Sequence, residues 1–183
     1  AEGKQQKLLK KIKEFGQDSG LLKEINIRRL GKHATDPFQV MIKAFKGPEV
    51  NIADVGYGVS QAIPVVVESA TLSKRQTLLV QQPEVHLHPR AQAALGSFFA
   101  GLVSETDNRF VIETHSDYMI DRVRREIALG AIKPKDVQIL FFNRPGLDTD
   151  VYSVSLDDMG NILDAPGCYR EFFLEEELAM LSR

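Results

Sequence analysis

The sequence predicts an α/β fold in which a mostly parallel sheet is flanked by helices and preceded by an antiparallel ribbon. From residue 77 onward, short apolar strands alternate with amphipathic helices, which is typical of a parallel sheet. Before that point, residues 24–30 and 38–45 alternate apolar and polar side chains with period two around a turn-like segment. That pattern predicts an antiparallel pair of strands.

Composition indicates a globular protein of ordinary size. The 183 residues are 43% hydrophobic and 26% charged, a balance that excludes a fibrous or low-complexity chain. No apolar run approaches the roughly 20 residues that a bilayer crossing needs, and the lysine-rich beginning lacks the apolar stretch of a signal peptide. Cys168 has no partner within the chain for a disulfide, so we expect a cytoplasmic protein. A net charge of −2 argues against general coating of nucleic acid.

The N-terminal arm is predicted to begin with an amphipathic helix over residues 5–15. Its apolar side chains fall on one stripe, lysines surround that stripe, and Gly16 is the expected stop. Residues 51–55 predict one more short strand after the ribbon.

Three helices are expected in the central part. The apolar run 62–67 predicts a buried helix with Pro64 in its first turn. A second helix begins at Pro89, and a third follows Ser116 and ends at Gly130.

The C-terminal part is predicted to be a hairpin and a helix. Residues 143–146 fit a type II turn between strands 137–142 and 151–156, and residues 170–181 predict a final amphipathic helix. We therefore divide the chain into an arm (1–55), a central lobe (56–143) and a C-terminal extension (144–183).

The first of three segments whose residues suggest a binding or catalytic role is the glycine-rich turn at residues 54–61. Gly56 and Gly58 let the backbone approach a ligand, Ser60 and Gln61 supply donors, and the following helix N-terminus favours phosphate. The simpler alternative is a capped turn in which Ser60 is the N-cap, because glycine turns are common.

The second segment, residues 78–89, carries Gln81, Gln82, Glu84, His86 and His88 after an apolar strand. Histidines at i and i+2 project from one side of an extended chain, so a metal site with Glu84 is one hypothesis. The alternative is a polar loop.

The third segment, residues 110–116, is a strand that ends in Thr114, His115 and Ser116 before a helix. A neutral His115 there is able to donate to a phosphate oxygen. Ser116 is expected to cap the helix in either case.

Together and in this order, the three segments resemble the C-terminal half of an ABC-class AAA ATPase of the SMC-like and OLD-like bacterial defence type. The resemblance implies that Gly58-Val-Ser-Gln61 is the signature motif, which reaches nucleotide phosphates across a dimer. It implies that residues 78–80 with Gln81 and Gln82 form the Walker B strand, and that His115 is the switch histidine. The implied ATP-contacting residues are Gly56, Gly58, Ser60, Gln61, His86 and His88, the last two in the D-loop.

Two departures limit what this resemblance implies. The sequence contains no G-x-x-x-x-G-K-[S/T] loop, so a Walker A lobe must come from a separate chain or a missing N-terminal half. The resemblance implies an acid at the end of the Walker B strand that holds Mg²⁺ through water, and often a second acid that orients the attacking water. In this sequence both positions, Gln81 and Gln82, are amides. Gln81 is thus a weakened Mg²⁺ position, Glu84 is a further metal candidate, and we expect slow or absent ATP hydrolysis.

The leading hypothesis is therefore an ATPase lobe that binds ATP and Mg²⁺ at a homodimer interface and couples closure to an effector protein. Two alternatives stay open. One is a metal-dependent hydrolase or nuclease that uses Glu84, His86, His88 and His115. The other is an interaction module whose lysine-rich first helix docks on nucleic acid or an acidic partner.

Overall fold

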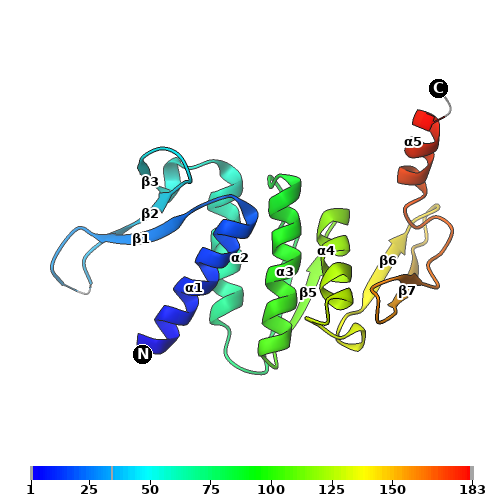
Figure 1. The fold of residues 1–183 in the computed structure, drawn as a ribbon, viewed down its shortest axis with the longest axis horizontal. Helices are drawn as coiled ribbons and strands as arrows, with labels where there is room; N and C mark the ends of the chain where they lie inside the picture. Colours follow the sequence, from blue (N-terminus) through cyan, green and yellow to red (C-terminus); the bar gives the residue numbers. More distant parts are fainter. Residues whose placement is uncertain (1, 34, 182–183) are drawn as a thin grey trace. The chain divides into compact units, whose positions relative to one another are not determined.

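A computed structural model describes residues 2–33 and 35–181 of the chain, which forms two compact units, Ala1–Val123 and Arg124–Arg183. The first unit holds the ribbon, three helices, a parallel pair of strands and most of α4 (Asp117–Ala128) (Figure 1). In the described part of the chain, no helix has both the length and the apolar character needed to cross a membrane.

The antiparallel ribbon is confirmed. β1 (Glu24–Arg29) pairs with β2 (Phe38–Lys43) from Glu24 opposite Lys43 to Arg29 opposite Phe38. The strand expected at 51–55 lies earlier, because β3 (Glu49–Asn51) pairs with β2 and then stops. It stops because the Asn51 side chain accepts a hydrogen bond from the backbone N–H of Ala53 at 2.9 Å and begins a 3-10 turn there.

The α/β class is also confirmed. β4 (Thr77–Gln81) and β5 (Arg109–Glu113) are parallel neighbours joined by α3 (Pro89–Glu105), which is a strand–helix–strand unit. The strand expected at 137–142 does not extend this sheet. It forms β6 (Ile139–Asn143), which pairs antiparallel with β7 (Asp150–Leu156) in the second unit.

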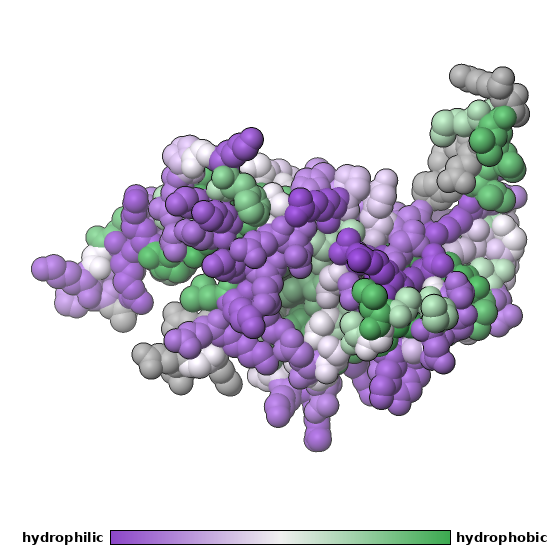
Figure 2. All heavy atoms as spheres, in the orientation of Figure 1, coloured by the Kyte–Doolittle hydropathy of each residue, from purple (hydrophilic) through white to green (hydrophobic). Residues whose placement is uncertain are grey.

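The second unit is built around that hairpin. Residues 144–149 connect β6 to β7, so the predicted reversal exists, with a longer loop than the four-residue turn expected at 143–146. β8 (Ile162–Leu163) adds a short antiparallel strand to β7. The final helix is α5 (Glu171–Leu181), and Figure 2 shows hydrophobic side chains gathered over it.

The core of the first unit lies between α1 (Glu2–Ser19), α2 (Tyr57–Thr71) and α3. α1 packs against both of the other helices, and the rings of Phe15 and Phe98 meet edge to face at 5.8 Å. The most buried side chains of this core are Leu22, Ile42, Ala62, Val66, Ala91 and Leu95.

Two expected helix boundaries were wrong. Gly16 lies inside α1, and the helix ends before Gly20, whose φ of +74° suits a glycine. A Cβ on Gly16 would stand 2.6 Å from the carbonyl oxygen of Leu22, so glycine is there to let the chain return closely over the helix. Pro64 lies inside α2 rather than in a first turn, because that helix already begins at Tyr57.

The expected boundaries of α4 hold. The backbone N–H of Met119 donates to Ser116 Oγ at 3.1 Å, so Ser116 caps the helix. Gly130 has a φ of +73° and follows the last turn.

A cluster of charges ties α1 to α3. Glu105, the last residue of α3, pairs with Lys11 at 2.9 Å and with Lys7 at 3.1 Å. The hydrogen bond from Lys11 lowers the pKa of the Glu105 carboxyl below its usual value, and the pairing with Lys7 acts in the same direction. The charged form of Glu105 therefore stabilises the packing of α1 on α3.

We expect Glu105→Gln to lower the free energy of unfolding at pH 7 by about 0.5–1 kcal/mol, as is typical of a partly exposed ion pair. Because the folded-state pKa is lowered, this contribution is present above the ordinary glutamate pKa of about 4.3 and is lost as the pH falls through the folded value. Urea unfolding at pH 7 and at pH 3 measures this. Glu14→Gln is the control, since the one ion pair of Glu14 among the described residues is with Lys10 on its own helix, and an equal effect of both substitutions would contradict the prediction.

Candidate nucleotide-phosphate site at the sheet edge

The carboxyl ends of the two parallel strands lie together. Gln81 ends β4 and faces Glu113 at the end of β5 in register, and both side chains are exposed. Gln81 Nε2 lies 3.4 Å from Glu113 Oε1, while the backbone N–H of Gln82 donates to the Glu113 carbonyl at 2.8 Å. Ligand sites of parallel α/β sheets form at this edge, so the position of Gln81 and Gln82 fits a binding role.

The chain between β4 and α3, residues 82–88, folds into a compact loop that we call the histidine loop. The backbone N–H of Val85 donates to the Gln82 carbonyl, and that of Leu87 donates to the Glu84 carbonyl. Gln82 and His86 have φ values of +44° and +66°, in the left-handed region that side chains other than glycine rarely adopt. Such strained backbone is concentrated at functional sites.

The extended conformation expected for the histidines was wrong. His86 lies in a turn, and His88 Nδ1 accepts the backbone N–H of Ala91 at 3.3 Å, so His88 is the N-cap of α3. The two imidazoles therefore do not project side by side from a straight segment.

The glycine-rich segment meets the histidine loop at its tightest point. A Cβ on Gly58 would lie 2.6 Å from the backbone oxygen of His86, so only glycine fits there. The Tyr57 ring meets the His86 ring edge to face with 4.7 Å between centroids. By contrast, Gly56 has open space where a Cβ would stand.

Ser60 does not cap this helix, which corrects one alternative. α2 begins at Tyr57 with Gly56 at the N-cap, and Ser60 lies in its first turn, where its hydroxyl donates to the Tyr57 carbonyl at 2.9 Å. The backbone N–H groups of Tyr57 and Gly58 open the helix and have no acceptor among the described residues. Gln61 is exposed on the same turn.

The third segment reaches the histidine loop from the other side. Glu84 Oε1 accepts the backbone N–H of His115 at 2.8 Å, and Glu84 is only 6% exposed. Its second oxygen, Oε2, is buried without a hydrogen-bond partner in the described part of the chain. A buried carboxyl oxygen left unpaired is costly, which points to a role other than stability.

A second link joins the same elements. Gln92 on α3 donates to the Leu87 carbonyl at 2.8 Å and accepts from the Ser116 hydroxyl at 2.6 Å. Because Ser116 also caps α4, the histidine loop, α3 and the start of α4 are held in one hydrogen-bonded unit. All three sequence segments therefore converge on residues 82–88.

The metal-hydrolase arrangement is not formed. Glu84, His86, His88 and His115 do not assemble into a cluster of three or more potential metal ligands, and no such cluster occurs elsewhere among the described residues. Glu84 bonds the backbone of His115, and His88 caps a helix, so both are already engaged.

Three of the lysines on α1 form ion pairs with residues of this chain. Lys7 and Lys11 pair with Glu105, and Lys10 pairs with Glu14. The arrangement offers no separate support for a nucleic-acid role of that helix.

The sequence analysis missed three contributors to this site: Tyr57, Gln92 and Glu113. Tyr57 and Gln92 are ordinary neighbours of motif residues, and their contacts depend on how the helices pack. Glu113 carried a usable signal, because it ends a strand parallel to the one that ends at Gln81.

Comparison with known proteins agrees with this geometry. The profile of a family described as AAA ATPase domain matches residues 2–120. The fold is similar to a chain from a study of ATP-driven dimerization and DNA-stimulated activation of SMC ATPases, with a TM-score of 0.55 and 11% identity over 94% of this chain and 91% of that one. No curated protein matches the sequence.

Two Smc head structures are similar as well. The SmcHead bound to the C-winged helix domain of ScpA gives a TM-score of 0.57 at 12% identity over 82% of this chain and 43% of that one. The Smc head with an extended coiled coil, bound to the C-terminal domain of ScpA from Pyrococcus furiosus, gives 0.54 at 12% identity over 94% and 37%. These similarities establish the fold, and the chain spans less than half of either Smc head chain.

We expect Gly58→Ala to destabilise the site, because the new methyl group meets the rigid backbone of His86. The loss should be about 1–3 kcal/mol in the free energy of unfolding. Gly56→Ala is the matched control, since its Cβ enters open space two residues away. Thermal unfolding of both variants decides the point, and equal melting temperatures would show that the α2 N-terminus does not pack on the histidine loop.

Glu84→Ala is expected to lower the free energy of unfolding by about 1–3 kcal/mol, because the partly buried N–H of His115 loses its acceptor. Glu84→Gln keeps an oxygen for that bond and should stay within about 1 kcal/mol of the parent. Urea unfolding measures both changes. A Glu84→Ala variant as stable as the parent would mean that Glu84 does not hold His115.

Proposed function

Because the chain belongs to the AAA ATPase domain family over residues 2–120, we propose that it is the signature and Walker B lobe of an ABC-class ATPase. In this proposal the lobe, completed by a Walker A lobe, binds ATP and Mg²⁺ at a homodimer interface. Closure of the dimer is passed to an effector protein, in the cytoplasm and in bacterial phage defence. The lobe on its own does not hydrolyse ATP.

The observation that carries the proposal is the convergence on the histidine loop. The α2 N-terminus touches this loop at His86, and the backbone of His115 is held to it by Glu84. A signature helix, a Walker B strand end and a switch residue that meet around one loop are in a position to couple the nucleotide bound in cis to the nucleotide held by the other subunit.

The α2 N-terminus suits a phosphate. Two backbone N–H groups without acceptors, at Tyr57 and Gly58, open a helix of 15 residues whose dipole favours negative charge. In the proposal, these groups and Ser60 bind the γ-phosphate of ATP held by the other subunit of the dimer. In the same proposal, the exposed Gln61, His86 and His88 also contact the nucleotide.

The strand ends suit Mg²⁺ less well. Gln81 and Glu113 offer oxygen donors of the kind that Mg²⁺ takes, and the buried Glu84 Oε2 lacks a partner among the described residues. Bound Mg²⁺ neutralises phosphate charge. Gln81 has the shape of a glutamate side chain without its charge. The favourable Coulomb energy between a carboxylate and a divalent cation, on the order of several kcal/mol, is therefore lost. We therefore propose that Gln81 favours a nucleotide-bound state with slow turnover, with His115 and Gln82 beside the γ-phosphate in cis.

The comparisons support the part of the proposal that concerns dimerisation and a partner protein. One similar chain comes from work on ATP-driven dimerization, and the Smc heads were solved with a partner, ScpA. For this chain, the homodimer and an effector partner are part of the proposal, and a direct role in nucleic-acid binding is not.

Gln81→Glu tests the proposal in the assembly with the Walker A lobe. The restored charge should raise the rate of ATP hydrolysis at least about tenfold, which corresponds to about 1.4 kcal/mol of transition-state stabilisation. Phosphate release measures the rate, and light scattering measures ATP-induced dimerisation. Gln6→Glu, which adds the same charge on the exposed surface of α1, is the control. An unchanged hydrolysis rate would defeat the role assigned to position 81.

A further inference from the structure

The edge of the parallel sheet carries an outward-facing carboxylate, but on the strand next to the one where the resemblance implies it. Glu113 ends β5, directly opposite Gln81 in the register of the two strands. Gln81 Nε2 donates to Glu113 Oε1 at 3.4 Å, and the backbone N–H of Gln82 donates to the Glu113 carbonyl at 2.8 Å. The end of β4 therefore holds Glu113 through a side chain and through the backbone.

The carboxyl group of Glu113 lies next to the place that an acid at position 81 would take. A glutamine side chain has the shape of glutamate, with Nε2 in the position of one carboxylate oxygen. Glu113 Oε1 lies 3.4 Å from that atom. Adjacent strands are only about 4.8 Å apart, so the ends of the two side chains reach the same region in front of the sheet edge. An acid on β5 thus brings its charge to this region from one strand away.

Glu84 is less suited to replace the missing acid. Its side chain is only 6% exposed, and Oε1 accepts the backbone N–H of His115 at 2.8 Å. Its other oxygen is buried as well. Mg²⁺ usually keeps several waters and binds substrate phosphates, which requires a carboxylate that these ligands reach. The exposed Glu113 meets this requirement.

We infer that Glu113 takes the place of the missing Walker B acid, so that its carboxylate, held by Gln81, supplies the charge for the Mg²⁺ of bound ATP. This inference rests on the proposed function and explains how ATP and Mg²⁺ are bound although position 81 has no charge. Proteins commonly bind Mg²⁺ with one or two carboxylates together with waters and phosphates. A cluster of three potential ligands, which the described residues do not form, is therefore not required.

The amide at position 81 suits a carboxylate at position 113. Two carboxylates in this arrangement would repel each other, whereas an amide donates a hydrogen bond to the carboxylate and fixes its orientation. Gln81 is thus a positioning residue for Glu113. Its own carbonyl oxygen is an acceptor of the kind that a Mg²⁺-bound water needs.

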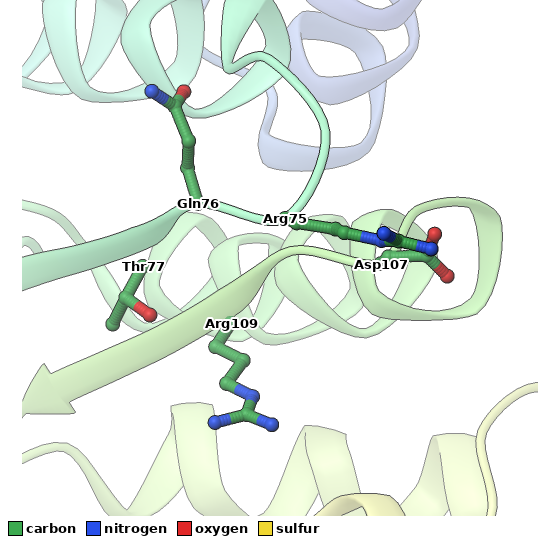
Figure 3. Close-up of a pocket in the computed structure, with 5 residues that line it drawn as sticks. All are labelled: Arg75, Gln76, Thr77, Asp107 and Arg109. Atoms are coloured by element: carbon green, nitrogen blue, oxygen red, sulfur yellow. The ribbon is translucent and has the colours of Figure 1, made fainter.

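The charges along the two strands direct a cation to the same end. Residues 81–88 and 113–116, at the carboxyl end, include Glu84 and Glu113 and no lysine or arginine. At the amino end, Figure 3 shows a cavity lined by Arg75, Gln76, Thr77, Asp107 and Arg109. Two guanidinium groups and one carboxylate make that end positive. A divalent cation is therefore attracted to Glu113 and repelled at the opposite end.

Calorimetric titration of ATP into the assembly with the Walker A lobe tests the inference, once with Mg²⁺ and once with EDTA. With Mg²⁺ present, Glu113→Gln should weaken ATP binding at least about tenfold in Kd. With EDTA, the same variant should bind ATP as tightly as the parent or more tightly, because a carboxylate repels a triphosphate when no cation lies between them. A variant that had merely lost its fold would bind ATP more weakly under both conditions.

Exchanging the two side chains separates the charge from its position. The double variant Gln81→Glu with Glu113→Gln returns the carboxylate to β4 and places the amide on β5. Its Kd for ATP with Mg²⁺ should recover to within about threefold of the parent value. Asp107→Asn is the matched control, because it removes a carboxylate at the amino end of the same strands (Figure 3). It should leave ATP binding unchanged with Mg²⁺ and with EDTA.

Parent-like binding of ATP by Glu113→Gln in the presence of Mg²⁺ would overturn the inference. A double variant that binds as weakly as Glu113→Gln alone would overturn it too. In both cases, ATP-induced dimerisation of the parent, measured by light scattering, would leave the proposed function standing. The expected binding pattern in an assembly that does not dimerise would support the role of Glu113 and reject the proposed dimer. A parent assembly that binds no ATP would overturn both.

Discussion

The contact between Gly58 and the carbonyl oxygen of His86 is the constraint on which the site depends. It brings the N-terminus of α2 against the histidine loop with no space for a side chain between them. From that loop, the buried carboxyl of Glu84 reaches the backbone of His115. The N-terminus of α2 and the backbone of His115 are therefore both linked to the same loop.

The parallel pair of strands gives this unit its direction. Both strands end at the same edge, so their polar terminal residues gather beside the histidine loop, while the opposite end carries arginines around a cavity. Between the ends, apolar side chains are exposed on one face. The polar strand ends and the exposed apolar face are two consequences of the same register.

The amide pair gives the site an unusual charge balance. Gln81 takes the place where the family resemblance implies an acid, and its nearest carboxyl partner is Glu113 on the neighbouring strand. With an acid at position 81, two carboxylates would face each other across the register and repel. The amide removes that repulsion and with it the charge that would draw a divalent cation, and the slow turnover that we propose rests on this loss of charge.

The sequence by itself determined the local elements and the order of the motifs. Period-two alternation placed β1 and β2, apolar spacing with Pro89 placed α3, and Ser116 marked the start of α4, because each of these signals acts over a few neighbouring residues. The sequence also located Gln81, His86 and His115 as polar groups at strand and helix ends.

Only the tertiary structure decided what those residues touch. Gly16 looked like a helix stop but serves the close return of Leu22, and His88 looked like a metal ligand but caps a helix. Glu84 meets His115 from 31 positions away in the chain, Gln92 meets Ser116 from 24, and Glu113 meets Gln81 from 32. Contacts of that kind arise from how helices and strands pack, and packing depends on the whole core, whereas the patterns read from sequence report only what adjacent residues prefer.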